Sequence, residues 1–295
     1  MAEISNIAVL GGGTMGLGIA HVAALAGYTT HLFDVSAPAL EKAEQRIHGN
    51  LDKGVEKGKV DAERAAAAKS RLTVGTELEA AVADSDLVIE AVPESIALKV
   101  EMFGRVVAAC PGHTLLSSNT SGLSITEMAA ATDRPDRFAG MHFFNPVHIM
   151  RLIELVRGLE TSAATIETLQ VVGERMGKEV VTVNESPGFV TSRINALIGN
   201  EAFRMLQGGV ASAEDIDKAL KLGLNHPMGP FEMVDLVGLD VRLSILEFLH
   251  RTLGDTYRPT TLMQQYVKAG RLGRKTGHGV YRYDDSGRRI HEEES

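Results

Sequence analysis

A glycine-rich turn near the start of the chain constrains its fold more than any other stretch. Residues 4–10 form a hydrophobic run typical of a buried strand, and Gly11, Gly13 and Gly16 follow with the spacing G-x-G-x-x-G. The first glycine permits a tight turn, the second lets the backbone approach a pyrophosphate, and the third lets the next helix pack closely on the strand. That helix would offer unpaired N–H groups and the positive end of its dipole to phosphates. The sequence therefore predicts a dinucleotide site, although glycines also mark ordinary turns.

An acidic residue closes the next predicted strand. Gly27 ends the helical pattern, and the apolar residues 28–33 lead to Asp34. Asp34 follows Gly13 at about the 20-residue distance expected of a carboxylate that accepts a hydrogen bond from the ribose 2′-hydroxyl. The same carboxylate would repel a 2′-phosphate, and no Arg or Lys follows it before Lys42. We therefore expect NAD, rather than NADP, as the cofactor.

Composition and charge narrow the class of protein. The 295 residues are enough for two hydrophobic cores, and 44% hydrophobic with 23% charged residues is typical of a soluble globular chain. A net charge of −8 argues against a nucleic-acid partner. Cys110 is the single cysteine, which suits a reducing compartment. Since no apolar run approaches the ~18 residues of a membrane span and no signal peptide is recognisable, we expect a cytoplasmic protein without a membrane partner.

The pattern of elements changes at about residue 185. Before it, strand signals at 71–74, 87–92, 114–118, 138–143, 152–156 and 178–183 are interspersed with helical stretches, including one at 163–176. After it, helical periodicity dominates at 189–206, 213–222, 230–253 and 259–269, with one possible strand at 279–283. The prediction is an α/β fold: a Rossmann-like N-terminal domain at 1–185, followed by an all-α C-terminal domain at 186–295.

Two helical stretches have more than one interpretation. Residues 38–70 are expected to form a helical-hairpin insertion, because a Gly-containing break at 58–61 divides two helical patterns. This insertion could project over the cofactor side, or be a solvated pair of charged helices. The first helix of the C-terminal domain carries an apolar stripe, which we interpret as core-facing. The stripe consists of Val190, Ile194, Leu197, Ile198 and Met205. Only residues 291–295 are expected to be disordered.

A dinucleotide site points to hydride transfer, which needs a base for the hydroxyl proton. Nucleophile-elbow, zinc-protease, Walker and Cys/His metal motifs are absent from the sequence, so no metal is expected. Histidine suits the role of base. Among ten histidines, His142 is the best placed, at the end of an apolar strand, with Glu154 on the next strand. A carboxylate beside the ring would fix its tautomer and stabilise the imidazolium. The pattern alone leaves open a merely buried histidine.

Several segments together resemble the 3-hydroxyacyl-CoA dehydrogenases, especially the short-chain 3-hydroxybutyryl-CoA dehydrogenases. These segments span nearly the whole chain and are residues 9–16, 89–94, 118–121, 142–147 with Glu154, 186–190, 223–230 and 271–275. The resemblance implies a Rossmann-like domain and a helical domain through which the chain forms a homodimer. It also implies the reversible NAD-dependent oxidation of a short-chain (S)-3-hydroxyacyl-CoA to the 3-ketoacyl-CoA.

The resemblance assigns roles residue by residue. His142 would be the catalytic base and Glu154 its partner, Ser121 would hydrogen-bond the 3-oxygen of the substrate, and Asn145 would help to place the nicotinamide and the thioester. The cofactor-binding positions, including those of the glycine turn, are Gly11, Gly13, Thr14, Met15, Gly16, Asp34, Ala91, Val92, Glu94, Lys99, Asn119 and Asn145.

Two further substrate positions follow from the same resemblance. Lys57, in the predicted hairpin, matches a lysine that meets the CoA phosphates in relatives. Ser192 stands where many relatives have an asparagine that contacts the substrate oxygen, so the contact is direct, bridged by water, or left to Ser121 alone. Two alternative functions remain: a 3-hydroxyadipyl-CoA dehydrogenase of aromatic degradation, and a non-catalytic NAD-binding relative. The retained catalytic set argues against the second.

Overall fold

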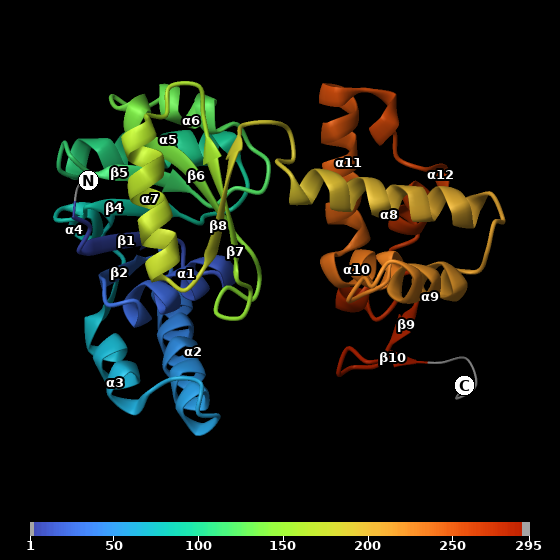
Figure 1. The fold of residues 1–295 in the computed structure, drawn as a ribbon, viewed down its shortest axis with the longest axis horizontal. Coiled ribbons are helices and arrows are strands. Elements are labelled where there is room, and N and C mark those ends of the chain that lie inside the picture. The colour runs from blue at the N-terminus through green and yellow to red at the C-terminus, as the bar shows by residue number, and fades with distance from the viewer. Residues whose placement is uncertain (1–2, 291–295) are drawn as a thin grey trace. The chain divides into compact units, whose positions relative to one another are not determined.

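The chain divides into two compact units. In a computed structural model that describes residues 3–290, the first unit is Met1–Phe189 and the second is Val190–Ser295 (Figure 1). The first unit is built on a mostly parallel sheet and the second is mostly helical, so the predicted fold class is confirmed. The expected disorder at 291–295 lies outside the described residues.

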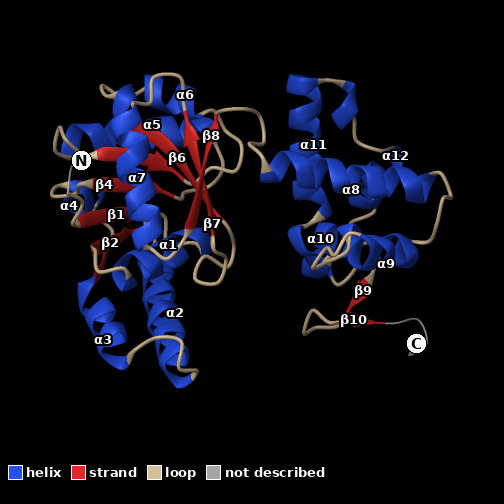
Figure 2. Ribbon diagram, in the orientation of Figure 1, coloured by secondary structure: helices blue, strands red, loops and turns tan. Residues whose placement is uncertain are grey.

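An eight-stranded sheet forms the centre of the first unit, in the order β3-β2-β1-β4-β5-β6-β7-β8 (Figure 2). Its strands are β1 Asn6–Leu10, β2 Thr29–Phe33, β3 Leu72–Gly75, β4 Leu87–Glu90, β5 Leu115–Ser118, β6 Phe138–Phe143, β7 Leu152–Arg157 and β8 Glu179–Asn184. All neighbouring strands pair in parallel except β6 and β7, which are antiparallel. The chain runs outward from β1 to one side and resumes at β4 on the other. The carboxyl ends of β1 and β4 therefore form a topological switch point, where open α/β sheets bind ligands.

Helices cover both faces of this sheet, which explains why inner strands such as β1 and β4 read as apolar runs. Successive residues of β1 point to opposite faces: Ile7 and Val9 join one core, and Ala8 and Leu10 join the other. The first core is completed by α1 Thr14–Leu25, α2 Ala37–Glu56, α3 Ala62–Arg71 and α7 Ala163–Arg175, and the second by α4 Leu78–Val82, α5 Ile96–Ala109 and α6 Ile125–Ala130. The short helices α4 and α6 were not predicted, because neither is long enough to show a helical period.

Two consecutive helices, α2 and α3, occupy nearly all of residues 38–70. Helices α2 and α3 extend away from the sheet in Figure 1. Ile47 and Leu51 of α2 and Ala68 of α3 are fully buried and belong to the same core as α1. The hairpin is therefore solvated on its outer face only, and its inner face is fixed by packing.

The second unit contains five α-helices among its described residues. They are α8 Thr191–Gln207, α9 Ala213–Gly223, α10 Pro230–Val237, α11 Leu239–Leu253 and α12 Thr261–Lys268. The prediction of one helix at 230–253 is wrong, because Gly238 adopts φ +106°, outside the helical region, and separates α10 from α11. The possible strand at 279–283 is only β9 Arg282–Tyr283, and it pairs with β10 Arg289–Ile290, which was not predicted.

The predicted core-facing stripe on α8 is also wrong in part. Val190 and Ile194 are each 52% exposed, whereas Ala202 and Phe203 are fully buried. Leu197 and Met205 of the stripe do pack against the core of this unit, but the fully enclosed face of α8 consists mainly of small residues and Phe203. The spacing of apolar residues predicted a helix correctly, but it could not separate a core-facing surface from an exposed one.

Candidate active site

The glycine turn has the geometry that a phosphate-binding turn needs. Gly11 adopts φ +111°, and a Cβ there would lie 2.6 Å from the carbonyl oxygen of Ala91. A Cβ on Gly16 would lie 1.7 Å from the carbonyl oxygen of Gly11, so only glycine lets α1 start this close to β1. A Cβ on Gly13 would meet no described atom within 4 Å, and Gly13 caps α1 without a side-chain hydrogen bond. The helix N-terminus therefore remains open to a pyrophosphate.

Asp34 lies directly against this turn. Its Oδ2 accepts a hydrogen bond from the backbone N–H of Gly12 at 2.7 Å, and its Oδ1 accepts one from Ser36 at 2.8 Å. These two N–H groups fix the carboxylate at the carboxyl end of β2. Within residues 3–290, Asp34 forms no ion pair with a cation. The turn, the helix start and a partly buried carboxylate are thus assembled as an NAD site requires.

His142 and Glu154 meet because β6 and β7 pair in register. The two residues are directly opposite each other, and the His142 Nδ1 lies 2.7 Å from the Glu154 Oε2. The exposed fraction is 0% for Glu154 and 6% for His142. A carboxylate can only accept, so the proton lies on Nδ1 and the Nε2 lone pair is left for proton transfer. The arrangement is that of a base oriented by a buried acid.

Aromatic rings and one amide complete the surroundings of His142. The rings of Phe144 and Phe189 have centroids 4.5 and 5.9 Å from that of the imidazole. The Asn119 side-chain oxygen accepts a hydrogen bond from the N–H of Phe143 at 2.8 Å, which ties the end of β5 to the end of β6. Asn145, which is exposed, follows two residues later, before a cis peptide bond to Pro146. These residues gather at the carboxyl ends of β5 and β6.

The turn that carries Ser121 is held by Glu94. The Oε1 of Glu94 accepts hydrogen bonds from the Thr120 hydroxyl at 2.5 Å and from the backbone N–H of Ser121 at 3.0 Å. The hydroxyl oxygen of Thr120 also accepts a hydrogen bond from the N–H of Leu123 at 2.9 Å. Ser121 itself is exposed. Its backbone is therefore fixed while its hydroxyl remains available to a ligand.

Lys99 supports this region from inside the protein rather than at its surface. It is 1% exposed, and its ammonium group donates to the two carboxylate oxygens of Glu90 at 2.6 and 2.9 Å. It also lies 3.3 Å from the Glu94 Oε2. Glu90 further accepts from Ser118 and from the N–H of Val92, each at 2.6 Å. Burial raises the pKa of Glu90, against the opposing effect of Lys99 and these hydrogen bonds. Lys99 therefore stabilises the carboxyl edge of the sheet through its ion pair with Glu94.

Glu90 was not among the predicted site residues. The available signal was its position, as an acid that closes the fully apolar run of β4. Its neighbours Ala91 and Val92 were predicted: Ala91 donates its N–H to Leu10 of β1 at 2.7 Å, and Val92 donates to Glu90. Thr14 and Met15 form the first turn of α1.

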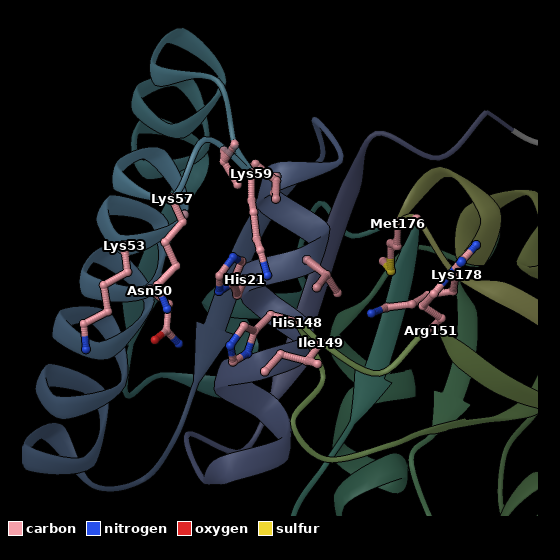
Figure 3. Close-up of a pocket in the computed structure, with 15 residues that line it drawn as sticks. His21, Asn50, Lys53, Lys57, Lys59, His148, Ile149, Arg151, Met176 and Lys178 are labelled. Atoms are coloured by element: carbon pink, nitrogen blue, oxygen red, sulfur yellow. The ribbon is translucent and has the colours of Figure 1, made fainter. Parts of the chain in front are cut away.

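Lys57 lines a separate cavity of about 450 Å³ in the first unit. Figure 3 shows Lys53 of α2 and Lys57, just past the end of that helix, on one side of the cavity, with Arg151 and Lys178 on the other. Its charged lining residues are the five cations Lys53, Lys57, Lys59, Arg151 and Lys178, and no described Asp or Glu lines it. None of the predicted catalytic residues lines it either. The cavity is therefore suited to an anion.

Two stacked histidines lie between the cations of this cavity. The rings of His21 and His148 are 5.5 Å apart and nearly parallel. Burial, followed by the charges of His148 and Lys178, lowers the pKa of His21 to about 4. His21 is therefore neutral near pH 7. Neither histidine was a predicted site residue, and the sequence holds no motif that would have marked them.

Ser192 lies in the second unit. It is the second residue of α8 and is partly buried. Among the predicted site residues, the structure thus brings together His142 with Glu154, Glu94 with Lys99 and Ser121, and Asp34 with the glycine turn.

Comparison with known families gives a consistent result over most of the chain. Residues 6–186 match the family described as 3-hydroxyacyl-CoA dehydrogenase, NAD binding domain, and residues 188–283 match the 3-hydroxyacyl-CoA dehydrogenase C-terminal domain. A probable 3-hydroxybutyryl-CoA dehydrogenase of Bacillus subtilis is 47% identical over 96% of this chain and 99% of its own length. A 3-hydroxyadipyl-CoA dehydrogenase of Escherichia coli is 42% identical over 95% of this chain and 59% of its own length.

A solved structure shows the same likeness. The crystal structure of (S)-3-hydroxybutyryl-CoA dehydrogenase from Ralstonia eutropha superimposes with a TM-score of 0.93 at 43% identity. The match covers 96% of this chain and 100% of that one.

Proposed function

Because the chain belongs to the 3-hydroxyacyl-CoA dehydrogenase family, we propose that it catalyses the reversible NAD-dependent oxidation of a short-chain (S)-3-hydroxyacyl-CoA, such as 3-hydroxybutyryl-CoA. The observation that carries the proposal is the His142–Glu154 pair at 2.7 Å, at the carboxyl edge of a sheet whose glycine turn fits a dinucleotide. Oxidation of a secondary alcohol needs both a proton acceptor and a hydride acceptor, and this arrangement provides for both.

The protein's part in the chemistry is proton transfer and positioning. The Nε2 of His142 takes the hydroxyl proton, and Glu154 stabilises the imidazolium that forms. In the reverse direction the imidazolium returns the proton to the 3-keto oxygen. In the oxidation direction Ser121, whose backbone is held by Glu94, donates a hydrogen bond from its hydroxyl to the 3-oxygen of the substrate as this oxygen gains carbonyl character. A positioned general base contributes a factor of about 10²–10⁴ to the rate.

The residues around the glycine turn would hold the cofactor. NAD, when bound, accepts the hydride from C3 of the substrate. Gly11, Gly13 and Gly16, with Thr14 and Met15, would leave the N-terminus of α1 open to the pyrophosphate. Asp34 would accept from the adenosine ribose, and Ala91, Val92, Glu94, Asn119 and Asn145 would surround the nicotinamide side, with Lys99 acting through Glu94.

The cationic cavity supports the proposal that the substrate is a CoA thioester. CoA carries a pyrophosphate and a 3′-phosphate, and Lys57 lies with four other cations around a space of about 450 Å³. Several ammonium groups without a lining carboxylate attract polyphosphate ligands. Ile149 adds an apolar side chain to the same lining. Ser192 is proposed as a further substrate residue, in place of the asparagine of many relatives.

The short acyl group is favoured over 3-hydroxyadipate. Relatives named 3-hydroxybutyryl-CoA dehydrogenase match this chain at 47%, 46% and 43% identity, and each match spans at least 96% of the relative. The relative named for 3-hydroxyadipyl-CoA matches at 42% over 59% of its length. A non-catalytic role is disfavoured, because Ser121, His142, Asn145 and Glu154 are all retained.

The second unit is proposed to form a homodimer. It exposes several large apolar side chains, which a protein interface would remove from water. They include Val190, Ile194, Leu222, Leu224, Leu236, Val237 and Val241. A second copy of the chain would cover them, and sedimentation equilibrium should give twice the 31.6 kDa of one chain. A monomer mass at micromolar concentration would contradict this proposal.

A cytoplasmic location is proposed from the single, buried Cys110, which suits a reducing compartment. Of the helices in the described part of the chain, none is long and apolar enough to cross a membrane.

The reaction is tested by following the loss of NADH absorbance with acetoacetyl-CoA, a longer 3-ketoacyl-CoA and 3-ketoadipyl-CoA. We expect the highest kcat/KM with acetoacetyl-CoA. A preference for 3-ketoadipyl-CoA would favour a 3-hydroxyadipyl-CoA dehydrogenase instead. Binding of NADH without turnover of any of the three substrates would favour a non-catalytic protein.

Asp34→Ala tests the cofactor assignment in the same assay. Removal of the carboxylate should lower the ratio of kcat/KM for NADH to kcat/KM for NADPH about tenfold or more. The reason is that Asp34 both binds the ribose and repels the 2′-phosphate. Unchanged discrimination between the two cofactors would show that Asp34 does not contact the ribose.

A further inference from the structure

A buried lysine lies behind the loop that joins the strands of His142 and Glu154. Lys178, just before β8, is 8% exposed. Its ammonium group donates to the backbone carbonyl of Val147 and, at 2.8 Å, to that of Met150. Within residues 3–290, no carboxylate lies within ion-pairing distance of it. A buried cation without a counter-charge is costly, so its presence here calls for a role beyond packing.

The segment that Lys178 holds is the turn at residues 146–150. This turn starts at the residue after Asn145, and the Pro146 carbonyl accepts hydrogen bonds from the N–H groups of Ile149 and Met150, each at 2.9 Å. Val147 is also buried against α1, where a Cβ on Gly18 would lie 2.7 Å from the Val147 Cβ. The turn is therefore held by two contacts, one with Gly18 of α1 and one with the Lys178 ammonium.

We propose that Lys178 is a positioning residue, which fixes the turn at 146–150 and thereby the direction in which Asn145 leaves β6. The proposal rests on the proposed function, in which Asn145 places the nicotinamide and the thioester. A single ammonium that donates to two carbonyls three residues apart sets the curvature of the turn, as no neutral side chain with one donor could. An error of about 1 Å in such a positioning group is enough to cost up to ~10²-fold in rate.

The rival explanation is that Lys178 binds phosphate, since it also lines the cationic cavity. The two roles predict different results with a substrate that lacks the nucleotide part of CoA. Acetoacetyl-pantetheine keeps the thioester and the reacting carbons but has no phosphate. A positioning role affects its turnover as much as that of acetoacetyl-CoA, whereas a phosphate-binding role affects only the CoA thioester.

The experiment compares Lys178→Met with Lys57→Met as the matched control. Methionine keeps the length of the lysine stem and removes its donors. We expect Lys178→Met to lower kcat about tenfold or more with both thioesters, with little change in KM for NADH. Lys57→Met removes a charge from the same cavity without touching the turn, so it should raise KM for acetoacetyl-CoA and leave acetoacetyl-pantetheine unaffected. Lys178→Arg should restore most of kcat, because a guanidinium can donate to both carbonyls.

A second readout does not depend on activity. The amides of Ile149 and Met150 should exchange hydrogen about tenfold faster in Lys178→Met and at the wild-type rate in Lys57→Met. If Lys178→Met does not fold, Gly18→Ala provides a second test: its Cβ would displace Val147 and should lower kcat with both thioesters.

Three results would overturn the proposal: a loss of kcat confined to the CoA thioester, wild-type kcat in both Lys178→Met and Gly18→Ala, or unchanged exchange of the two amides. A wild-type protein that does not turn over acetoacetyl-CoA would contradict the proposed function instead, and the exchange rates would still decide the role of Lys178.

Discussion

Buried carboxylates occur in both units of the protein, but their partners differ. In the first unit, Glu154 lies 2.7 Å from a histidine whose other ring nitrogen is left for proton transfer. In the second unit, Asp235 accepts hydrogen bonds from the N–H groups of Val280 and Tyr281 and from the hydroxyl of Tyr283, at 2.8–2.9 Å. A carboxylate surrounded by fixed donors cannot take part in proton transfer, whereas one that orients a titratable ring can.

A second carboxylate of the helical unit follows the same structural pattern. Asp217 of α9 accepts from the N–H groups of Phe231 and Glu232 at the start of α10, and from the hydroxyl of Tyr281. It therefore caps a helix from a distance and anchors the C-terminal segment. Burial alone thus does not mark a functional acid; what distinguishes Glu154 is the chemistry of its partner.

The largest expected effect is on catalysis, in His142→Gln. Glutamine can still donate to Glu154 but cannot take up a proton, so kcat should fall by two or more orders of magnitude. NADH affinity, measured by fluorescence titration, should change little, because the glycine turn is untouched. Wild-type turnover in this variant would remove His142 from the mechanism and with it the contrast between the two units.

Asp235→Asn should affect stability and not chemistry. The amide group would direct its own N–H toward backbone donors that now have one acceptor fewer, at a cost of about 2 kcal/mol in the free energy of unfolding. Urea unfolding measures this cost, and kcat per folded molecule should stay near the wild-type value. A large fall in kcat with unchanged stability would show that the buried acids of the second unit are not purely structural.

A smaller effect is expected on the pH dependence of stability. Burial lowers the pKa of His21 from 6.5 to about 4, so the folded protein keeps it neutral while the unfolded chain takes up a proton below pH 6.5. Stability should therefore fall as the pH drops from 6.5 toward 4, by at most about 3 kcal/mol from this residue. In His21→Gln, urea unfolding at pH 7 and pH 5 should show a smaller difference. An equal difference between pH 7 and pH 5 in the wild type and in His21→Gln would show that other residues cause the loss of stability at low pH.

The first unit was predictable in outline because its signals are local. The glycine spacing, the acid after β2 and the apolar runs of the strands each follow from short-range steric and burial rules, and their sequence order determines the parallel sheet. The pairing of His142 with Glu154 could be anticipated because both lie on consecutive predicted strands. What the sequence did not contain was the register that places them opposite each other.

The contacts that were missed connect distant parts of the chain. Lys178 holds the turn at 146–150, His21 stacks on His148, and Glu90 joins Lys99 to Ser118. No periodicity or motif reports such pairings, since each depends on the packing of separate elements. In the second unit the break at Gly238 and the exposed residues of α8 were missed for a related reason: helical spacing describes a helix but not its neighbours.

If His142 and Glu154 act as one unit, the effects of their substitutions on kcat should not add, and a double-mutant cycle measures this. Acetoacetyl-CoA reduction is measured for wild type, His142→Gln, Glu154→Gln and the double variant. We expect Glu154→Gln alone to lose about tenfold or more, and the double variant to be no slower than His142→Gln, because the acid has no catalytic role without its histidine. Losses that multiply in the double variant would show instead that the two residues act independently.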